Sequence, residues 1–354
     1  MEIVKGFNDF VGENAIKREE IRKILVRTFE NYGFEPAETP IIEYEEFVKE
    51  GNSQDEAVSD IFKLQDKGKR KLALRYELTF QLKRIAKNKK LPYKRYQIGE
   101  VFRDEPVSSN RFRQFTQCDV DIFGSTIKDD AEILAIVQEI LNELKIDSVT
   151  YINSRNLLNE ILEKEGILNK ESVLREIDKL GKLDEKEIRT NLKKYKAEKI
   201  LDIIKKNEKF FENYSAYSEI RELKNYLGYY KLDKKVVFLP SLSRGLSYYN
   251  GNVFEVRVKN KKDSILGGGS YKFNNVQATG ISFGLERLSI LSKIDIEKEK
   301  YLIVSLNQDK EAIALAEKMR KLKKIISIYY GKPSKALEYA NSYGFSKVIF
   351  IGEK

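Results

Sequence analysis

Residues 93–123 read YKRYQIGEVF-RDEPVSSN-RFRQFTQCDVDIF. Tyr93–Phe102 and Arg113–Phe123 are rich in aromatic and β-branched residues, which favour extended backbone. The stretch between them, Asp104–Asn110, is polar and contains a proline, a composition typical of a loop. Together these features predict an antiparallel hairpin with a long connection.

Outside this hairpin, the hydrophobic pattern predicts helices and strands in turn. Apolar residues at helical spacing predict helices over 13–32, 77–87 and 130–144. Lys, Glu, Leu, Ile and Asn dominate residues 153–224, where repeated helical spacing predicts a helical insertion. Further strands are predicted at 41–42, 72–75, 236–239 and 252–258, and residues 280–291 start extended and turn helical.

The end of the chain has a different pattern. Residues 294–300 are charged and fit a linker. The segments 301–306, 310–322, 325–330, 334–343 and 347–351 then predict strand, helix, strand, helix, strand. This alternation favours a small α/β unit with a parallel sheet.

Composition excludes several classes of site. The 354 residues include no histidine, which removes the commonest general base, Ser-His-Asp triads and imidazole metal ligands. The single cysteine, Cys118, excludes an internal disulfide and a cysteine metal cluster. No apolar run approaches the ~18–20 residues of a membrane span, and we expect a cytosolic protein without one.

The net charge of +10, from 65 Lys and Arg against 55 Asp and Glu, suits a polyanionic partner such as nucleic acid. A lysine-rich composition alone would give the same charge.

The hairpin carries the first group of residues that could support chemistry. Arg103, Arg111 and Arg113 lie around the loop, with Glu105 between them and Phe115 just after. Guanidinium groups bind phosphate oxygens in a bidentate manner, and an aromatic ring beside them can stack on a base. This pattern favours a nucleoside-triphosphate site that lacks a Walker loop. The plainer interpretation is a surface hairpin with solvated charges.

Two later segments add candidates. Residues 244–255 read RGLSYYNGNVFE, a polar turn with paired tyrosines that leads into a strand. Residues 280–288 read GISFGLERL, in which Arg287 could clamp a phosphate or pair with a carboxylate such as Glu286. Taken singly, each could also be an ordinary hairpin or helix start.

In chain order, these segments resemble the signature motifs of class II aminoacyl-tRNA synthetases. The three motifs correspond to the long helix ending in Thr39-Pro40, the hairpin, and Gly284-Leu285-Glu286-Arg287. Arg244-Gly245-Leu246-Ser247-Tyr248-Tyr249 resembles the histidine motif of the histidyl-tRNA synthetases. Residues 74–79, LRYELT, and 115–121, FTQCDVD, resemble other substrate-binding segments of that family, in a form closer to its archaeal and eukaryotic members.

The resemblance covers essentially the whole chain and implies an α+β fold, an antiparallel sheet flanked by helices. It divides the chain into a catalytic core over 1–152 and 225–296, a helical insertion over 153–224, and a shortened anticodon-binding-like α/β domain over 297–354. It implies a cytoplasmic homodimer that uses ATP and Mg²⁺ to convert histidine to histidyl-adenylate and then transfers it to tRNA(His). No resident metal site is implied.

The same resemblance assigns residues by motif. Arg103 and Arg244 are the catalytic pair at the α-phosphate and the histidine carboxylate. ATP is expected to contact Arg103, Glu105, Arg111, Phe115 and Arg287. Histidine is expected to contact Glu77, Thr79 and Gln117 through its α-ammonium group, and Asp121, Tyr249 and Tyr271 around its imidazole. Tyr248 is a further expected histidine contact.

Some residues depart from the family pattern. Ser247 stands where the family commonly has Asp, and Ser270-Tyr271-Lys272 where it commonly has Arg-Tyr-Asp. Two alternatives stay open: a regulatory protein on the same fold that resembles the regulatory subunit of ATP phosphoribosyltransferase, and a class II synthetase for another amino acid.

Overall fold

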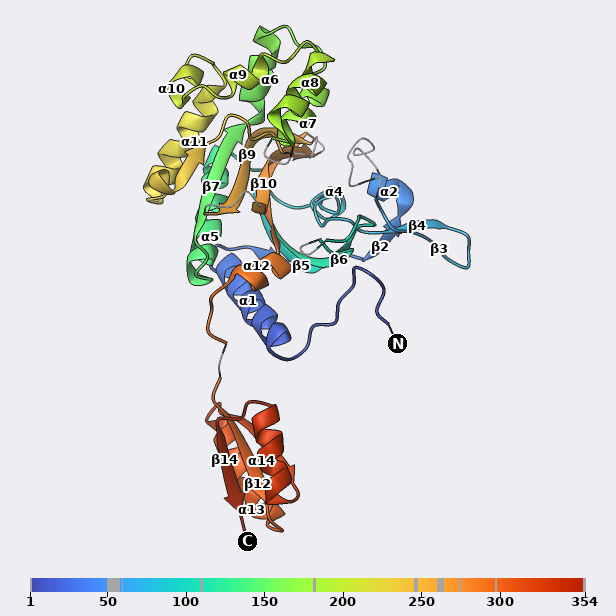
Figure 1. Cartoon of the computed structure of the whole chain (residues 1–354), viewed down its shortest axis with the longest axis vertical. Coiled ribbons are helices and arrows are strands. Elements are labelled where there is room, and N and C mark those ends of the chain that lie inside the picture. The colour runs from blue at the N-terminus through green and yellow to red at the C-terminus, as the bar shows by residue number, and fades with distance from the viewer. Residues whose placement is uncertain are drawn as a thin grey trace. The chain divides into compact units, whose positions relative to one another are not determined.

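The computed structural model describes residues 2–49, 58, 60–108, 111–180, 183–244, 248–259, 264–273, 275–296 and 298–352. The chain forms two compact units, residues 1–294 and residues 295–354 (Figure 1). The first unit contains the hairpin and all the motifs of the sequence analysis. The finer division into core, insertion and anticodon-binding-like domain stays a prediction.

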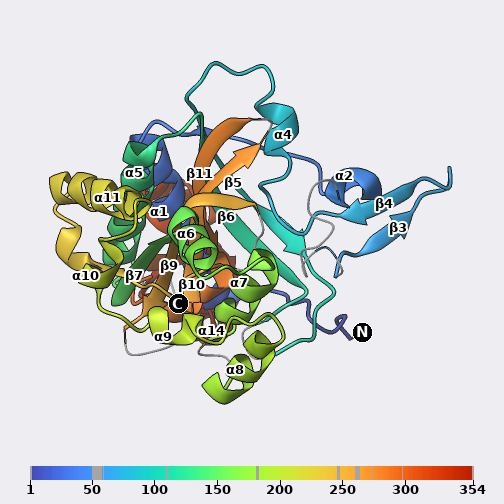
Figure 2. The ribbon, with the colours of Figure 1, turned by 90° about the horizontal axis from the view of Figure 1, so that it is seen from above.

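A sheet of eight strands, mostly antiparallel, organises the first unit (Figure 2). Its strand order is β1-β5-β6-β11-β10-β9-β7-β8. The predicted hairpin is confirmed, because β5 and β6 pair along their whole length, from Tyr93 opposite Phe123 to Phe102 opposite Gln114. The strands are β1 (Glu35–Pro36), β5 (Tyr93–Phe102), β6 (Gln114–Phe123), β7 (Ser148–Ser154), β8 (Val236–Phe238), β9 (Tyr249–Val258), β10 (Ser264–Phe273) and β11 (Val276–Gly284).

Three helices, α1 (Gly12–Asn31), α5 (Ile127–Glu143) and α12 (Leu285–Leu291), share one hydrophobic core with the sheet. Helix α1 contacts both of the others, and its Phe29 ring lies 5.9 Å from that of Phe283 on β11. Helix α5 starts three residues before the predicted position, because Thr126 and Asp129 form a capping box there.

A second, smaller sheet has the order β2-β4-β3 and packs with a short helix, α2 (Glu45–Lys49). Its strands are β2 (Ile42–Tyr44), β3 (Lys63–Gln65) and β4 (Lys71–Leu74). Strand β4 leads directly into residues 75–81, which enter the first unit's interior.

The helix predicted over 77–87 is wrong in its extent, because α4 covers only Leu82–Ile85. The residues before it are buried in non-helical backbone; Glu77 is 4% exposed and Thr79 is 8% exposed. The Arg95 guanidinium donates a hydrogen bond of 2.9 Å to the Leu78 carbonyl. That carbonyl is therefore committed to a tertiary contact.

The segment between β7 and β8 is helical, as predicted. Its helices pack through apolar residues that belong to the same core as α1 and α5. They are α6 (Arg155–Lys164), α7 (Lys170–Asp178), α8 (Glu185–Lys193), α9 (Ile200–Ile203), α10 (Glu208–Phe211) and α11 (Tyr217–Tyr229). Across the ranges that the structure describes, no helix combines the length and apolarity needed to cross a bilayer.

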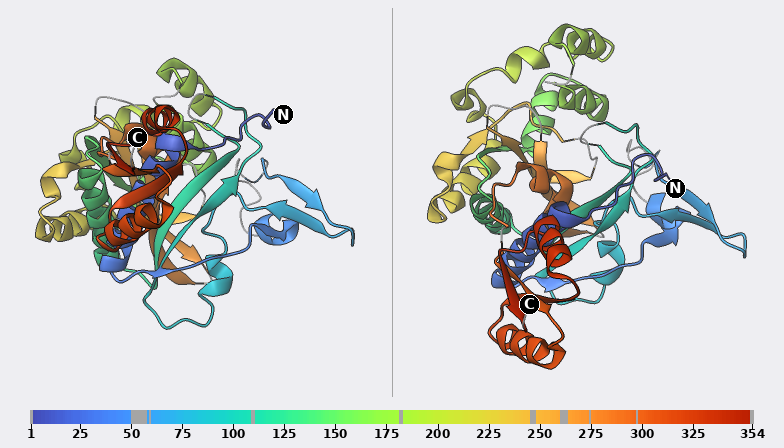
Figure 3. Two further views of the ribbon diagram at one scale, coloured as in Figure 1. Left: turned by 90° about the horizontal axis from the view of Figure 1, so that it is seen from below. Right: turned by 60° about the horizontal axis from the view of Figure 1, so that its bottom comes forward.

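The second unit confirms the predicted alternation. A parallel sheet of order β13-β12-β14 carries one helix on each face, because α13 packs on Tyr301 and Ile303 while α14 packs on Leu302 and Val304 (Figure 3). Its elements are β12 (Lys300–Ser305), α13 (Asp309–Lys321), β13 (Ile325–Tyr330), α14 (Pro333–Ser342) and β14 (Lys347–Ile351).

The packing of β10 on β11 yields a stability prediction for Gly268. A Cβ atom at Gly268 would lie 2.1 Å from the Gly280 carbonyl oxygen and 2.7 Å from the Ile281 Cα. We expect Gly268→Ala to lower the free energy of unfolding by about 3 kcal/mol, because the obstacle is backbone that has no room to move. Urea unfolding followed by circular dichroism measures the change.

The matched control is Gly228→Ala. Gly228 lies within α11, and a Cβ atom there would meet no atom within 4 Å. The change should raise stability by up to about 1 kcal/mol through helix propensity. Equal effects of the two substitutions would contradict the steric account.

Candidate active site

The site is built on the face of the large sheet that points away from α1, α5 and α12. Alternate residues of a strand point to opposite faces. Val120 and Ile122 of β6 pack in the helix-covered core, so Gln117, Asp119 and Asp121 point the other way. We call this the site face. The residues opposite these three are Gly99, Gln97 and Arg95 on β5 and Gly284, Ser282 and Gly280 on β11.

Asp121 is the centre of a buried polar group. Its side chain is 4% exposed and receives the Tyr271 hydroxyl at 2.5 Å, while the fully buried Arg95 guanidinium lies 2.8 Å from its other oxygen. Burial raises the pKa of Asp121, and Arg95 and Tyr271 oppose that shift. A Cβ atom at Gly280 would lie 2.1 Å from Asp121 Oδ1, so only glycine leaves room for this carboxylate.

Three tyrosines predicted to surround an imidazole do come together. Tyr249 on β9 pairs with Tyr271 on β10, and the Tyr248 ring lies 4.9 Å from that of Tyr249 and 5.6 Å from that of Tyr271. Burial raises the pKa of all three phenols, so they stay protonated at neutral pH. The charge of Glu77 also raises the pKa of Tyr248.

The predicted ammonium-binding residues lie on the same side. Gln117 donates to the Ser282 hydroxyl at 2.6 Å, and its buried amide oxygen accepts no hydrogen bond in the described structure. Glu77 and Thr79 are buried in the chain that follows β4. A carboxylate, a hydroxyl and an amide oxygen are suitable acceptors for an ammonium group.

Arg244 approaches the site from the other edge. Its guanidinium donates to Glu255 Oε2 at 3.0 Å, and a Cβ atom at Gly267 would lie 2.1 Å from that group. The backbone of Arg244 has a φ of +60°, a conformation that a non-glycine residue rarely adopts. The next residues of the predicted histidine motif, 245–247, lie outside the described residues, and Ser247 is one of them.

The arginines of the hairpin loop also gather. The Arg103 guanidinium donates to the Tyr76 carbonyl at 3.1 Å and lies 5.1 Å from the centre of the Phe115 ring. Glu105 has carboxylate oxygens 3.9 Å from both Arg103 and Arg111. The guanidinium groups of Arg103 and Arg111 therefore both lie near the Glu105 carboxylate. The Arg103 group also lies near the Phe115 ring. In the polar loop that follows, Ser109 and Asn110 are outside the described residues.

Arg287 starts from α12, next to the end of β11. Its guanidinium donates to the Ser264 carbonyl at the start of β10. The neighbouring Glu286 is buried, accepts from Arg18 at 2.9 Å and receives the Thr116 backbone N–H at 3.1 Å. Glu286 thus ties α1 and β6 to α12, and Arg287 stands beside that anchor.

Sequence reasoning missed four charged residues of this site: Arg75, Arg95, Asp119 and Glu255. Arg95 and Asp119 follow the same two-residue alternation as Gln117 and Asp121, which was the available signal. Arg75 donates to the carbonyls of Thr39 and Glu100 above Gly99. Its position shows no pattern in the sequence, because it depends on a contact between β4 and β5.

We searched the described residues for a possible metal centre. Among the described residues, no group of three or more His, Cys, Asp or Glu side chains is placed to hold a metal ion.

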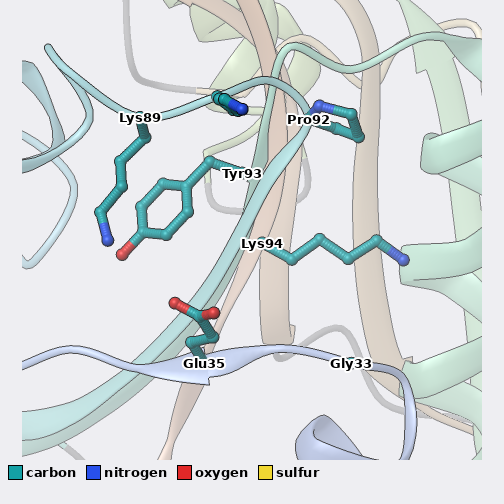
Figure 4. A pocket seen from close by; sticks show the side chains of 7 residues that line it. Gly33, Glu35, Lys89, Pro92, Tyr93 and Lys94 are labelled. Atoms are coloured by element: carbon teal, nitrogen blue, oxygen red, sulfur yellow. The ribbon is translucent and has the colours of Figure 1, made fainter.

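A separate cavity of about 330 Å³ lies at the edge of the sheet beside β1 (Figure 4). It is lined by Gly33, Glu35, Lys89, Lys90, Pro92, Tyr93 and Lys94. Figure 4 shows Lys94 pointing away from Lys89, and its ammonium group is paired with Glu132. None of the predicted site residues lines this cavity.

Asp119 gives a prediction about stability and pH. Burial raises its folded-state pKa to about 7, against about 3.9 in the unfolded chain. Between about pH 4 and pH 7 the folded protein therefore binds more protons than the unfolded chain, so stability falls as the pH rises through this window. Asp119→Asn removes this group. We therefore expect the free energy of unfolding to fall less steeply with rising pH, by up to about 1.4 kcal/mol per pH unit. Urea unfolding at several pH values from 4.5 to 8 measures it.

The control is Asp66→Asn. Asp66 is paired with Arg70 in the β3–β4 turn, and its pKa is lowered, so its contribution is lost only as the pH falls. The control should keep the wild-type decline between pH 5 and pH 7. An unchanged decline in Asp119→Asn would show that Asp119 is ionised in the folded protein.

Comparisons with known proteins agree with this geometry. The family model described as histidyl-tRNA synthetase matches residues 6–288. Histidine–tRNA ligase 1 of Bacillus cereus is 32% identical over 398 residues, covering 100% of this chain and 92% of that protein. The histidine–tRNA ligase of Helicobacter pylori strain J99 is 32% identical over 401 residues, covering 99% and 90%.

Solved structures show the same fold. The histidyl-tRNA synthetase of Nostoc sp. PCC 7120 superposes with a TM-score of 0.84 at 24% identity, over 98% of this chain and 90% of that one. A Bacillus halodurans chain described as ATP phosphoribosyltransferase regulatory subunit/histidyl-tRNA synthetase superposes with a TM-score of 0.83 at 20% identity. The match covers 100% of this chain and 99% of that one. The predicted α+β fold, an antiparallel sheet flanked by helices, is thus confirmed. The predicted archaeal and eukaryotic character and the shortened C-terminal domain stay predictions.

The family model spans most of the chain, and relatives about one-third identical cover nearly all of it, so the chain belongs to the histidyl-tRNA synthetase family.

Proposed function

We propose that this chain is a histidine–tRNA ligase that activates histidine with ATP and transfers it to tRNA(His). The observation that carries the proposal is the buried Asp121, held by Arg95 and Tyr271 within a group of tyrosines on the site face. A buried hydrogen-bonding carboxylate suits the N–H group of an imidazole. The family match and the names of the relatives support the same reaction.

The site would bind histidine both at its imidazole side chain and at its α-ammonium group. Asp121, Tyr249 and Tyr271 would bind the imidazole. The Tyr248 ring would pack against the rings of the other two tyrosines. Glu77, Thr79 and the Gln117 amide oxygen would accept the three protons of the α-ammonium group. A site built from such buried partners can reject analogues by about 10⁴-fold or more, since a wrong side chain leaves them unpaired.

ATP would lie toward the hairpin loop. Phe115 would stack on the adenine ring, with Arg287 on its far side, and Glu105 would accept from the exocyclic amine. Arg103 would hold the α-phosphate and the histidine carboxylate, and Arg111 the terminal phosphates. ATP would enter as its Mg²⁺ complex, in which the cation neutralises phosphate charge.

The chemistry then needs no protein base. A histidine carboxylate oxygen attacks the α-phosphorus, its new P–O bond replaces the bond to the β-phosphate, and pyrophosphate leaves. What the reaction requires is two anions held together and the developing charge neutralised. Arg103 and Arg244 would supply that charge. In the transfer step, a phosphate oxygen of the adenylate would accept the ribose hydroxyl proton.

The proposal extends to partners and location. We place the enzyme in the cytoplasm, where the single free cysteine, buried Cys118, would stay reduced. A homodimer is supported by the exposed apolar residues Ile41, Ile42 and Tyr44 at the start of the small sheet. The net charge of +10 supports tRNA binding.

A regulatory protein is the second candidate, because the Bacillus halodurans chain with nearly the same fold carries both names in its title. The arginine and tyrosine groups described above favour the ligase, since a regulator does not need a set of arginines for ATP. A ligase for another amino acid is the third outcome of the test. Pyrophosphate exchange that depends on histidine, with charging of tRNA(His), separates the three.

Arg244→Ala tests the assignment of the catalytic arginines. Because a charge that stabilises the transition state is lost, we expect histidine-dependent ATP–pyrophosphate exchange to fall by about 10²–10³-fold in kcat. Exchange is measured without tRNA, so that tRNA binding has no influence on the result.

The control is Arg189→Ala on α8, which removes an exposed guanidinium paired with Asp202. It should leave exchange within about twofold of the wild type. Exchange near the wild-type rate in Arg244→Ala would remove Arg244 from the reaction, and wild-type exchange with an amino acid other than histidine would overturn the proposed substrate.

A further inference from the structure

Behind the tyrosine group lies a buried carboxylate that the proposed reaction does not use. Asp130, in the first turns of α5, is 2% exposed. It accepts a hydrogen bond of 2.8 Å from the Asn252 amide on β9 and bonds of 2.8 and 3.0 Å from the Ser270 hydroxyl on β10. One carboxylate from a helix therefore joins two neighbouring strands of the sheet.

The two strands are irregular at this point. Gly269 pairs with Val253, but two residues further along β10, Tyr271 pairs with Tyr249, four residues back along β9. Strand β9 thus has three residues, 250–252, opposite the single Ser270, which is a bulge. Asn252 and Ser270, the two partners of Asp130, are residues of this bulge.

The bulge decides which residue of β9 stands opposite Tyr271. Without the extra residues of β9, Tyr271 would stand opposite Gly251, and Tyr249 would stand opposite Phe273. With them, Tyr249 stands opposite Tyr271, whose hydroxyl donates to Asp121 at 2.5 Å. The bulge is also tightly packed, because a Cβ atom at Gly251 would lie 3.0 Å from the Ser270 Cβ.

We propose that Asp130 is a positioning residue for histidine recognition: by holding Asn252 and Ser270, it fixes the bulge that sets Tyr249 opposite Tyr271, the tyrosine that donates to Asp121. Asp130 itself touches no substrate. Asp130 is carried by helix α5 and faces the sheet from it. The effect of Asp130 on catalysis therefore passes through Ser270 and Tyr271. This inference rests on the proposed function, because the group that Tyr271 would bind is the imidazole of the histidine substrate.

The test uses the full-length chain and the smallest change, Ser270→Ala, which removes one hydroxyl. Loss of a hydrogen bond to a buried carboxylate should raise the KM for histidine by about five- to tenfold. The KM for ATP should change by less than about twofold, since the ATP residues lie on other strands. Ser270→Thr keeps the hydroxyl and should restore the KM for histidine to near the wild-type value.

A double-mutant cycle separates this role from simple stabilisation. Tyr271→Phe removes the hydroxyl of the tyrosine that the bulge pairs with Tyr249, so Ser270→Ala should add less than about twofold in the Tyr271→Phe background. Asp129→Asn is the matched control, since Asp129 lies in the same helical turn and bonds only to Thr126 in the described structure. It should leave both KM values unchanged.

Three results would overturn the inference while the wild type stays active: an unchanged KM for histidine in Ser270→Ala, an equal rise in both KM values, or full additivity with Tyr271→Phe. Wild-type protein without any histidine-dependent exchange would instead contradict the proposed function. The two failures are therefore distinguishable. Asp130→Ala, where it folds, should show the same pattern with a larger rise in the KM for histidine.

Discussion

The site depends on bare backbone at a few positions of the central sheet. Cβ atoms at Gly99, Gly267 and Gly280 would lie 2.1–2.4 Å from a terminal atom of Arg75, Arg244 or Asp121. Because these strands carry no side chain there, charged groups lie flat on the sheet instead of standing above it. The absence of these side chains lets the charged groups approach the backbone of the sheet closely.

Buried charge then sets a second condition, which is pairing. A buried charge without a partner is strongly unfavourable, so Asp121 needs Arg95, Arg244 needs Glu255, and Glu286 needs Arg18. Apart from Arg244 and Glu255, the partners are distant in sequence, 26 and 268 residues apart. These pairs add little net stability. What they do is fix which strand and helix meet, and so they fix the positions of the groups around the site.

Much of this could be predicted from the sequence where a regular period carries the signal. Alternation predicted β5 and β6, helical spacing predicted α1 and α5, and the motifs assembled Arg103, Glu105 and Phe115. The helix over 77–87 failed because tertiary contacts with Arg95 and the tyrosines overrode local propensity. Asp130 was taken only as a helix residue, since its partners on β9 and β10 lie 122 and 140 residues away.

A chain with no histidine still keeps groups that titrate near neutral pH. Burial raises the pKa of both Asp119 and Asp130 to about 7, one on the site face and one behind it. Neither is required as a base, because the attacking carboxylate and the leaving pyrophosphate carry their own charge. Burying these carboxylates therefore serves to hold donors in place: Asp119 beside Gln117, and Asp130 on Asn252 and Ser270. In the proposed reaction the catalytic demand falls instead on arginines, whose charge does not change with pH in this range. The proposed site would therefore recognise an imidazole in a chain that has no histidine of its own.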